Sequence, residues 1–446
     1  MEKLFGTDGI RCLAGEFPLD EKTVRIIGAS FARRLRENLG RHPRFVSGRD
    51  TRESGSWIEA GFLAGAASEN AICESSGVVT TPCVAYLAGA FDFDAGIVIS
   101  ASHNPYQDNG IKIFSPTGRK IDEATERAIE NDIFAGMDAG TGTVDLHPAR
   151  MDEFRRGYLE HLKKTANDLS ANGVKIVVDC ANGASSELAP VLFADLGADV
   201  IAIHNQPDGR NINENCGSLH LQHLQAKVLK QNADLGVAFD GDADRALFVD
   251  EKGNIVDGDA TLWIMARYLK DHGKLPNSIV VATVMSNIGL EIALRSQGIE
   301  LLRANVGDKY VLEKLIETGS AVGGEQSGHI IFPEISLVGD GMMTALLLLR
   351  AIREKGVSLS SGCEGFVRFP QILLNVKVRE KLPFDVVPEI AAAAKQIENE
   401  LAGAGRLLLR YSGTEDLARV MIEGEDQTQI EAQARRLIDV IRNTLG

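Results

Sequence analysis

The chain has 446 residues and a formal net charge of −15, with 62 acidic against 47 basic side chains. This acidic balance argues against nucleic acid and anionic membranes as partners, and a phosphorylated ligand would need a local basic cluster. The length predicts two to four domains, and 44% hydrophobic with 24% charged residues is typical of a soluble globular protein.

The first 150 residues alternate helix and strand patterns. A tight loop comes first, in which two glycines flank Asp8 and which carries Arg11. The elements expected after it are a helix over 21–38, a strand over 44–47, a helix over 56–70, a strand over 77–79, a further helix, and a buried strand over 95–99. This alternation favours βαβ units with mostly parallel strands, whose functional loops follow the carboxyl ends of strands.

Two further units continue the same pattern of strand, polar turn and helix. The second is expected to hold a helix over 151–168, a strand over 174–180 with a turn over 181–186 into a helix, and strands over 234–239 and 247–250 with a turn over 251–254. The third is expected to hold a helix over 260–271, a strand over 278–283, a helix opened by Ser286, a strand with a turn over 321–331, and a helix over 341–354. The shared pattern predicts a structural repeat.

The C-terminal stretch, residues 368–446, has a different order of helices and strands. It predicts strands over 372–378, 406–410 and 417–422, with helices over 384–401 and 426–443, the second opened by a capping box of Asp426 and Gln429. This order is typical of an α+β unit. Aperiodic segments over 135–150 and 362–370 mark two of the boundaries, and the expected domains are residues 1–150, 151–256, 257–367 and 368–446.

The sequence predicts neither a signal peptide nor a membrane-spanning helix. The start, MEKLFGTDGIR, lacks the charged-then-apolar order of a signal peptide, and no apolar run approaches the roughly 20 residues of a membrane-spanning helix. Six cysteines are scattered without a CxxC pair. Reduced thiols, and therefore a cytoplasmic protein with no membrane partner, are the expectation.

A serine and a histidine follow the buried strand over 95–99. Ser102 and His103 stand in the run Ser-Ala-Ser-His-Asn-Pro, where Pro105 stops regular structure. A hydroxyl beside an imidazole is a candidate nucleophile, because serine is a weak nucleophile until a neighbouring group activates it. By itself the run is more typical of a polar turn that caps a helix, so its meaning depends on the other motifs.

Three carboxylates alternate directly after the apolar strand over 234–239. Asp240, Asp242 and Asp244 would repel one another without a cation, and oxygen ligands suit Mg²⁺ or Ca²⁺. An EF-hand has acids at these spacings, but it needs glycine where Arg245 stands and helices where this sequence has strands. A phosphatase with Asp240 as nucleophile is the other alternative, although it leaves Ser102 idle. The pattern favours a metal site over an acidic surface turn.

Residues 410–415 read Arg-Tyr-Ser-Gly-Thr-Glu, and Arg419 follows closely. Hydroxyl groups, a glycine that exposes backbone N–H groups, and two guanidinium groups suit a bound phosphate. An ordinary strand connection with a surface arginine is the alternative for this motif taken alone.

Three glycines bracket Glu325, Ser327 and His329 in the segment 323–329. Alternate residues of an extended strand share a face, so these side chains are expected to point into one cleft. A carboxylate and a hydroxyl there suit a polyol such as a sugar. The alternative is a glycine-rich hairpin whose polar residues are incidental.

Together these stretches supply a nucleophile, a metal site, a polyol loop and a phosphate cradle, one on each expected domain. Phosphoryl transfer needs this combination, because its catalysis is mainly positioning and charge neutralisation. The local positive charge would come from seven basic residues: Arg11, Arg49, Lys112, Arg245, Lys309, Arg410 and Arg419.

Over essentially its whole length the chain resembles the α-D-phosphohexomutase superfamily. The motifs that carry the resemblance are Phe-Gly-Thr-Asp-Gly-Ile-Arg at 5–11, the serine run at 100–105, Asp240 to Arg245, Gly324 to His329, and Arg410 to Glu415. The resemblance implies three related α/β domains with mixed sheets around a central cleft, plus a smaller C-terminal α+β domain. Four features resemble the branch that acts on glucosamine phosphates: the Gly-Thr-Asp-Gly-Ile-Arg start, Gln326, Asn211-Ile212-Asn213 and Cys216-Gly217-Ser218.

The resemblance also implies a reaction. A phosphoserine at Ser102 would exchange its phosphoryl group with a hexosamine phosphate through a bisphosphorylated sugar, interconverting the 6- and 1-phosphates for UDP-N-acetylglucosamine and cell-wall precursors. The implied cofactors are a hexose 1,6-bisphosphate as activator and one Mg²⁺, held by Ser102, Asp240, Asp242 and Asp244. The residues implied at the transfer site are Arg11, His103, Lys112, Arg245 and His329. The implied substrate ligands are Glu325, Ser327, Arg410, Ser412, Gly413, Thr414 and Arg419.

The sequence departs from that branch at five places: Cys12, Ala243, Lys309, Ser336-Leu337-Val338 and Asp416. None removes an implied catalytic group, but lysine at 309 would weaken bidentate phosphate contact, and Asp416 adds negative charge beside the cradle. The alternatives that stay open are a phosphoglucomutase or phosphomannomutase of the same superfamily, a metal-dependent sugar phosphatase, and a non-catalytic sugar-phosphate sensor. Large α/β enzymes of this kind often self-associate, so a homodimer is compatible with the sequence.

Overall fold

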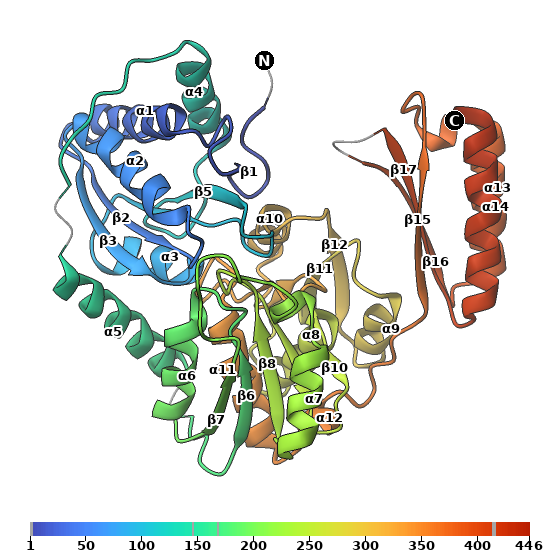
Figure 1. The fold of residues 1–446 in the computed structure, drawn as a ribbon. Coiled ribbons are helices and arrows are strands. Elements are labelled where there is room, and N and C mark those ends of the chain that lie inside the picture. Colours follow the sequence, from blue (N-terminus) through green and yellow to red (C-terminus); the bar gives the residue numbers. More distant parts are fainter. Residues whose placement is uncertain (1–2, 145–146, 167–168, 413–415) are drawn as a thin grey trace. The chain divides into compact units, whose positions relative to one another are not determined.

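The computed structural model describes residues 3–144, 147–166, 169–412 and 416–446. The chain forms two compact units (Figure 1). Unit 1 contains the residues up to 285 together with 301–364, and unit 2 contains 286–300 together with 365–446. Among the described residues, no helix combines the length and the apolar character needed to cross a membrane.

The first sheet of unit 1 is mixed. Its strands are β1 (Ile10–Leu13), β2 (Arg44–Arg49), β3 (Ile72–Val78), β4 (Ala95–Ile99) and β5 (Asp108–Phe114), and its helices are α1 (Glu21–Leu39), α2 (Gly55–Ser68), α3 (Thr81–Ala90) and α4 (Glu123–Phe134). The strand order is β1-β5-β4-β2-β3. β2 pairs in parallel with β3 and β4, whereas β5 pairs antiparallel with β4 and β1. The mixed sheet is confirmed, and the expectation of mostly parallel strands is wrong.

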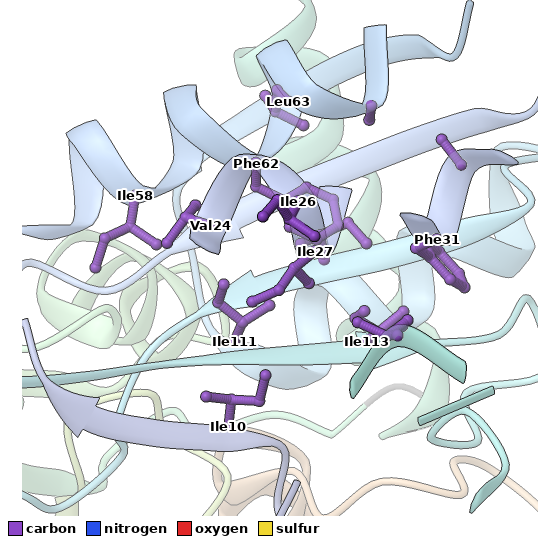
Figure 2. Packing of buried hydrophobic residues seen from close by; sticks show 14 of the residues in the cluster. Ile10, Val24, Ile26, Ile27, Phe31, Ile58, Phe62, Leu63, Ile111 and Ile113 are labelled. Atoms are coloured by element: carbon purple, nitrogen blue, oxygen red, sulfur yellow. The ribbon is translucent and has the colours of Figure 1, made fainter. Parts of the chain in front are cut away.

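One apolar layer joins α1 and α2 to this sheet (Figure 2). Val24, Ile27 and Phe31 follow helical spacing on α1 and are buried against strand residues such as Ile111. The two helices cross so closely that a Cβ at Gly28 would lie 2.0 Å from the carbonyl oxygen of Phe62. Only glycine permits this approach, which holds the helix pair on one face of the sheet.

The second and third sheets of unit 1 follow in chain order. The second region contains α5 (Pro148–Thr165), β6 (Lys175–Asp179), α6 (Ser185–Asp195), β7 (Asp199–Ile203), η1 (Gly217–Leu219), α7 (Gln222–Gln231), β8 (Leu235–Phe239), β9 (Ala246–Asp250) and β10 (Ile255–Val256). The third contains α8 (Gly258–Asp271), η2 (Pro276–Ser278), β11 (Ile279–Thr283), β12 (Glu300–Ala304), α10 (Asp308–Thr318), β13 (Gly323–Gly324), β14 (Ile330–Ile331), α11 (Gly341–Lys355) and α12 (Leu359–Gly362).

The three sheets share one topology, which confirms the expected structural repeat. The common strand orders are β5-β4-β2-β3, β9-β8-β6-β7 and β14-β13-β11-β12. In each sheet the third strand of the repeat pairs in parallel with the first and antiparallel with the fourth. β1 and β10 are additional edge strands of the first two sheets.

Unit 2 is an α+β structure, as expected for the C-terminal region. It contains α9 (Ile288–Ser296), β15 (Gln371–Lys377), η3 (Phe384–Val386), α13 (Pro388–Leu401), β16 (Arg406–Tyr411), β17 (Leu417–Glu423) and α14 (Gln427–Leu445). Its sheet has the order β15-β17-β16 with antiparallel pairs. Asp426 caps α14 by accepting a hydrogen bond from the Gln429 backbone N–H at 2.9 Å, which confirms the predicted cap.

Several local expectations need correction. The loop predicted around Arg11 contains β1, because its backbone finds partners in β5. β3 begins at Ile72 instead of 77, since pairing with β2 accommodates the polar run before it. α9 begins at Ile288, capped by Asn287 rather than opened by Ser286. The sequence patterns also did not single out eight of the helices and strands: β5, β7, β10, β12, α4, α7, α10 and α12.

A buried carboxyl group at the start of α11 makes the stability of unit 1 depend on pH. Asp340 accepts hydrogen bonds from the Met343 backbone N–H at 2.9 Å and from the Tyr158 hydroxyl at 2.8 Å. Burial raises the pKa of Asp340 to about 6. A folded-state pKa above the unfolded value means that the ionised group destabilises the fold, so its stability is highest below about pH 4 and declines as the pH rises through 6.

We therefore expect Asp340→Asn to stabilise the protein at neutral pH. Asparagine keeps the helix cap and removes the buried charge, so the free energy of unfolding should rise by about 2 kcal/mol at pH 7.5 and change little at pH 4. Urea unfolding of both proteins at the two pH values measures the difference. An equal loss of stability at both pH values would contradict the expected charge effect.

Candidate active site

The three loops that carry the proposed chemistry occupy equivalent places in the three sheets. Each joins the third strand of the repeat to the fourth: residues 100–107 follow β4, residues 240–245 follow β8, and residues 325–329 follow β13. The repeat therefore supplies one functional loop from each α/β sheet of unit 1.

Ser102 lies at the tight turn after β4. Its backbone is left-handed, with φ of 53°, and its side chain is buried. The hydroxyl donates a hydrogen bond to Asp240 Oδ2 at 2.6 Å and lies 3.2 Å from His103 Nδ1. Positive φ is costly for a residue with a Cβ, so this conformation requires support from the surrounding structure.

Arg52 provides much of that support. Its side chain is fully buried, and its guanidinium donates hydrogen bonds to the carbonyl oxygens of Ser102 at 3.0 Å and Asn104 at 2.9 Å. It also forms an ion pair with Asp50 at 2.9 Å. Asp50 in turn accepts a hydrogen bond from Ser100 Oγ at 2.6 Å. Sequence analysis did not assign a role to Arg52, although it stands in the polar run directly after the strand pattern over 44–47.

The three aspartates form a buried cluster whose ligand oxygens lie within 4.8 Å of one another. Lys112, also buried, donates to Asp242 Oδ2 at 2.9 Å and to Asp244 Oδ2 at 3.5 Å. Asp242 Oδ1 and Asp244 Oδ1 are buried and make no hydrogen bond within the described part of the chain. Unsatisfied buried carboxylate oxygens are expensive unless a cation binds them, so the residues fit a divalent metal ion with oxygen ligands.

The cluster shows opposing electrostatic effects. Burial, followed by the Asp244 and Asp242 carboxylates, raises the pKa of Asp240 well above its usual range. Burial also acts to raise the pKa of Asp244, but Lys112 and His329 outweigh it and hold that pKa well below its usual range. Lys112 and His329 therefore compensate the charge of Asp244, whereas burial and the neighbouring carboxylates dominate at Asp240, which accepts the hydrogen bond of the Ser102 hydroxyl.

A cleft of about 420 Å³ opens beside the cluster, a volume within the range of small-molecule sites. It brings together eight of the residues singled out from the sequence: Arg11, His103, Asp244, Arg245, Glu325, Gln326, Ser327 and His329. Residues not singled out also line it: Thr7, Asp8, Thr283, Met285, Val306, Gly307 and Asp308. Ser102 and Asp240 do not line this cleft, and they reach it through His103 and Asp244.

Three predicted residues lie at the cleft, but strand alternation is not the reason. They are Glu325, Ser327 and His329. Residues 325–329 are not one extended strand, because β13 and β14 form an antiparallel hairpin with Gly328 at φ of 91°. The Gly328 backbone N–H donates to the Glu325 carbonyl oxygen at 3.0 Å, which closes the turn. A hairpin tip, rather than strand alternation, places Glu325, Ser327 and His329 at the cleft.

The two histidines at the cleft differ in charge. Burial, with Arg245 and Arg11 nearby, lowers the pKa of His103 to about 4, so its ring is neutral at neutral pH. Burial also acts to lower the pKa of His329, but the Asp244 carboxylate 3.6 Å away outweighs it and raises that pKa to about 9. One imidazole can therefore accept a proton and the other can donate one.

Asp8 connects the basic residues of the cleft. Its carboxylate pairs with Lys112 at 3.0 Å, with Lys120 at 2.6 Å, and with Arg11. Lys120 also pairs with Asp308 at the start of α10. The sequence indicates only that Asp8 is the centre of a glycine-flanked loop, because nothing in it shows that the distant Lys112 and Lys120 converge on this carboxylate.

In unit 2, the phosphate motif lies on the hairpin of β16 and β17. Arg410 and Arg419 are directly paired across these strands. Ser412 accepts a hydrogen bond from Arg419 at 3.4 Å. Two like charges opposite each other on a sheet are unfavourable unless an anion lies between them. Gly413 and Thr414, the other predicted ligands, lie outside the described residues.

Comparisons with known proteins identify the family. Four phosphoglucomutase/phosphomannomutase family models match in order: alpha/beta/alpha domain I at residues 2–139, domain II at 156–253, domain III at 257–369, and the C-terminal domain at 373–440. The phosphoglucosamine mutase of Solibacter usitatus is 47% identical, covering 99% of both chains. That of Caldicellulosiruptor bescii is 47% identical, covering all of both. The chain belongs to the phosphohexomutase family.

Solved structures agree with this assignment. A phosphoglucomutase/phosphomannomutase family protein of Burkholderia thailandensis has a TM-score of 0.81 and 25% identity, covering 100% of this chain and 98% of its own. The N-acetylphosphoglucosamine mutase of Aspergillus fumigatus, solved in complex with GlcNAc-6P and magnesium, has a TM-score of 0.67 at 18% identity, covering 99% and 96%. This second likeness shows the fold. The phosphohexomutase architecture, with three α/β domains and a smaller C-terminal domain, is thereby confirmed.

Two basic residues of this phosphohexomutase do not lie where sequence analysis expected them. Arg49 pairs with Glu59 at 3.1 Å, and Lys309 pairs with Glu123 at 2.9 Å. Neither lines the cleft. Lysine at 309 therefore makes its ion pair at a neighbouring hollow.

The other departures from the glucosamine branch also lie outside the lining of the cleft. Leu337 and Val338 line the same neighbouring hollow, not the cleft. Asp416 is exposed and lies 3.5 Å from Lys381, which offsets its charge. Ala243 has φ of 54° and is buried, a backbone conformation that favours glycine. Cys12 lies on β1, where its thiol contacts the Phe17 carbonyl oxygen at 3.3 Å.

Asn213 reaches the serine loop from the second α/β region. Its side-chain amide donates to the carbonyl oxygens of Ser102 at 2.9 Å and Asn104 at 3.1 Å. Sequence analysis connected this asparagine only with the choice of substrate. Its contacts instead support the turn that presents the serine hydroxyl.

We expect Asn213→Ala to lower kcat about 10- to 100-fold, because a loosened serine turn misplaces the reacting oxygen. Asn211→Ala is the matched control, since Asn211 lies in the same loop but contacts Gln206 and Asp208 instead of the serine turn. Steady-state kinetics of both variants measure the effect. Equal losses in the two variants would assign the effect to general disturbance of the loop.

Proposed function

We propose that this chain is a phosphoglucosamine mutase that interconverts glucosamine 6-phosphate and glucosamine 1-phosphate. One observation carries the proposal: the Ser102 hydroxyl lies 2.6 Å from Asp240 in a buried carboxylate cluster. The full-length relatives named phosphoglucosamine mutase support the substrate. The product would feed UDP-N-acetylglucosamine and cell-wall precursor synthesis in the cytoplasm.

The reaction would use Ser102 as the phosphoryl carrier. A hydroxyl oxygen of the bound sugar phosphate attacks the phosphorus of phosphoserine 102, the serine Oγ–P bond breaks, and a sugar O–P bond forms. The resulting hexosamine 1,6-bisphosphate turns by about half a revolution and returns its other phosphoryl group to Ser102. The sugar hydroxyl loses its proton in the first transfer and the departing sugar oxygen regains one in the second, so no group is consumed.

Mg²⁺ is the metal that this function requires, held by the phosphoserine with Asp240, Asp242 and Asp244. A buried cluster of three carboxylates, with Asp242 Oδ1 making no hydrogen bond to a described residue, fits a hard divalent cation. When bound, the ion would neutralise the oxygens of the transferring phosphoryl group. Arg11, Lys112 and Arg245 supply further positive charge around the same position.

Proton transfer is assigned to the cleft histidines. His103, neutral with a pKa of about 4 and 3.2 Å from the serine oxygen, is suited to accept a proton or a hydrogen bond. His329, with a pKa of about 9, is suited to donate a proton to the departing sugar oxygen. Lys112 is unsuited to act as a base, because Asp242, Asp8 and Asp244 outweigh burial and hold its pKa above the usual range.

Binding of the sugar is assigned to the hairpin tip and to unit 2. Glu325 and Ser327 would bind sugar hydroxyls. The distal phosphate would be bound by Arg410, Ser412, Gly413, Thr414 and Arg419, and the opposed guanidinium groups of the hairpin support this assignment.

Gln326 is the side chain on which the choice of glucosamine is proposed to depend. It lines the cleft between the two proposed sugar ligands, and its amide can accept a hydrogen bond from a sugar amino group. We expect Gln326→Met to reduce kcat/KM for glucosamine 6-phosphate about 10-fold and to change that for glucose 6-phosphate less. An equal reduction for both sugars would remove Gln326 from the specificity assignment.

A coupled assay with glucosamine 6-phosphate, Mg²⁺ and a catalytic amount of hexose 1,6-bisphosphate tests the proposed function. Formation of the 1-phosphate is the expected result. Faster turnover of glucose or mannose phosphates would favour the sister activities, and release of inorganic phosphate without isomerisation would favour a phosphatase. The mass of the purified protein adds a second test, since the proposal requires a phosphoryl group on Ser102.

A further inference from the structure

A second group of metal-type ligands lies in the middle α/β region, apart from the aspartate cluster. Asp179 ends β6, His204 follows β7, and Cys216 precedes η1. Their ligand atoms all lie within 4.8 Å of one another. Asp179 and Cys216 are buried, and His204 is partly exposed. No step of the proposed reaction uses these residues.

The closest contact inside this group joins the histidine to the aspartate. His204 Nδ1 is buried and lies 3.0 Å from Asp179 Oδ2. Asp179 accepts one backbone N–H on each oxygen, from Ala181 at 2.9 Å and Gly217 at 3.1 Å, and each oxygen retains a lone pair for another partner.

The types of ligand atom in this group indicate which class of metal ion it would bind. A thiolate, an imidazole and a carboxylate together suit Zn²⁺ and similar transition-metal ions, whereas Mg²⁺ prefers oxygen ligands alone. His204 also borders a hollow of about 270 Å³, which offers an entry path from solvent. The other residues of that hollow are Ile203, His223, Ala226, Lys227 and Lys230.

The position of the group connects it to the serine turn. The Asn213 backbone N–H donates to the Ala181 carbonyl oxygen at 2.9 Å, and the Asn182 backbone N–H donates to the His204 carbonyl oxygen at 2.6 Å. An ion bound to all three ligands would therefore join the loops after β6 and β7 to the segment that carries Asn213. That segment holds the carbonyl oxygen of Ser102.

We propose that Asp179, His204 and Cys216 form a structural site for Zn²⁺ or a similar transition-metal ion, separate from the magnesium site, that fixes the loop carrying Asn213. The proposal does not depend on which sugar the enzyme uses. A cysteine binds such an ion as the thiolate, so a metal–thiolate signal would report binding at Cys216.

Cobalt is the probe, because a cysteine thiolate bound to Co²⁺ gives a near-ultraviolet charge-transfer band that oxygen ligands do not give. The full-length, metal-stripped protein is titrated with Co²⁺ in excess Mg²⁺, which occupies the aspartate cluster. We expect one Co²⁺ per chain, a thiolate band, and its loss on addition of Zn²⁺. Cys216→Ser should abolish the band, and His204→Ala should weaken Co²⁺ binding at least about 10-fold. Cys180→Ser is the matched control, since Cys180 is a buried neighbour outside the group, and it should keep the band.

Thermal unfolding gives an independent readout. Zn²⁺ added in excess Mg²⁺ should raise the unfolding temperature of the unmodified protein and of Cys180→Ser, but not that of Cys216→Ser. Absence of a thiolate band in the unmodified protein, or a band that persists in Cys216→Ser, would overturn the proposal and leave an Asp179–His204 ion pair. Neither measurement uses catalysis, so failure here and failure of the mutase assignment are distinguishable.

Discussion

Alanine at position 102 is expected to reduce mutase activity by about 10⁴-fold or more, because Ser102→Ala removes the only oxygen that the proposed cycle can phosphorylate. The melting temperature should change little, since the Asp50–Arg52 network continues to hold the turn through backbone carbonyl oxygens. The coupled assay measures the activity, and the mass of the intact protein should lose its phosphoryl group.

Two other serines make this test specific. Ser115→Ala should leave activity unchanged, because the Ser115 hydroxyl makes its hydrogen bond with the Thr117 hydroxyl and not with a residue of the serine turn. Ser100→Ala should keep the phosphoryl group and lose about 10-fold in kcat, because Ser100 accepts the Ser102 backbone N–H at 2.9 Å and positions the turn. Full activity of Ser102→Ala, or loss of the phosphoryl group only in Ser100→Ala, would contradict the carrier assignment.

Asp240→Asn is expected to separate metal binding from folding. The variant keeps an acceptor for the Ser102 hydroxyl but removes one negative charge from the cluster. We expect activity to fall at least about 10²-fold, and Mg²⁺ to lose its effect on stability. In the unmodified protein, Mg²⁺ at 100 times its dissociation constant should add about 2.7 kcal/mol to the free energy of unfolding.

Without metal, Asp240→Asn is expected to change the free energy of unfolding in the opposite direction. Burial, with Asp244 and Asp242, raises the pKa of Asp240 well above its usual range, so its ionised form destabilises the fold at neutral pH. Without metal, Asp240→Asn should therefore be at least as stable as the unmodified protein. Asp234→Asn is the control at the other end of β8, where the side chain accepts the Lys175 backbone N–H. Retention of the magnesium effect in Asp240→Asn would remove this residue from the metal site.

The repeat explains why the three candidate loops could be located from the sequence. Each loop follows a short apolar strand, and each carries residues whose chemistry is evident without a partner: a hydroxyl beside an imidazole, alternating carboxylates, and a glycine-bracketed carboxylate. Strong local signals of this kind do not depend on tertiary contacts. The hairpin geometry of the Glu325 loop was missed, because alternation of polar residues is the same in a strand and in a tight turn between two short strands.

The residues that support these loops were not recognisable in the same way. Arg52 and Asn213 act on carbonyl oxygens of residues that are 50 and 111 positions away. Asp8 binds Lys112 and Lys120, which lie more than a hundred positions away in the sequence. Their residue types are common on protein surfaces, and only burial and convergence distinguish them from solvated side chains.

By itself the sequence determined the family, the four-part α/β and α+β organisation, and the identity of the serine turn, because these depend on residue types at short spacing and on apolar periodicity. Only the tertiary structure decided the mixed pairing of the sheets, the displacement of Arg49 and Lys309 from the cleft, and the network around Ser102. The physical reason is that pairing partners, burial and charge compensation are properties of segments distant in the chain, and they come into existence only when those segments pack together.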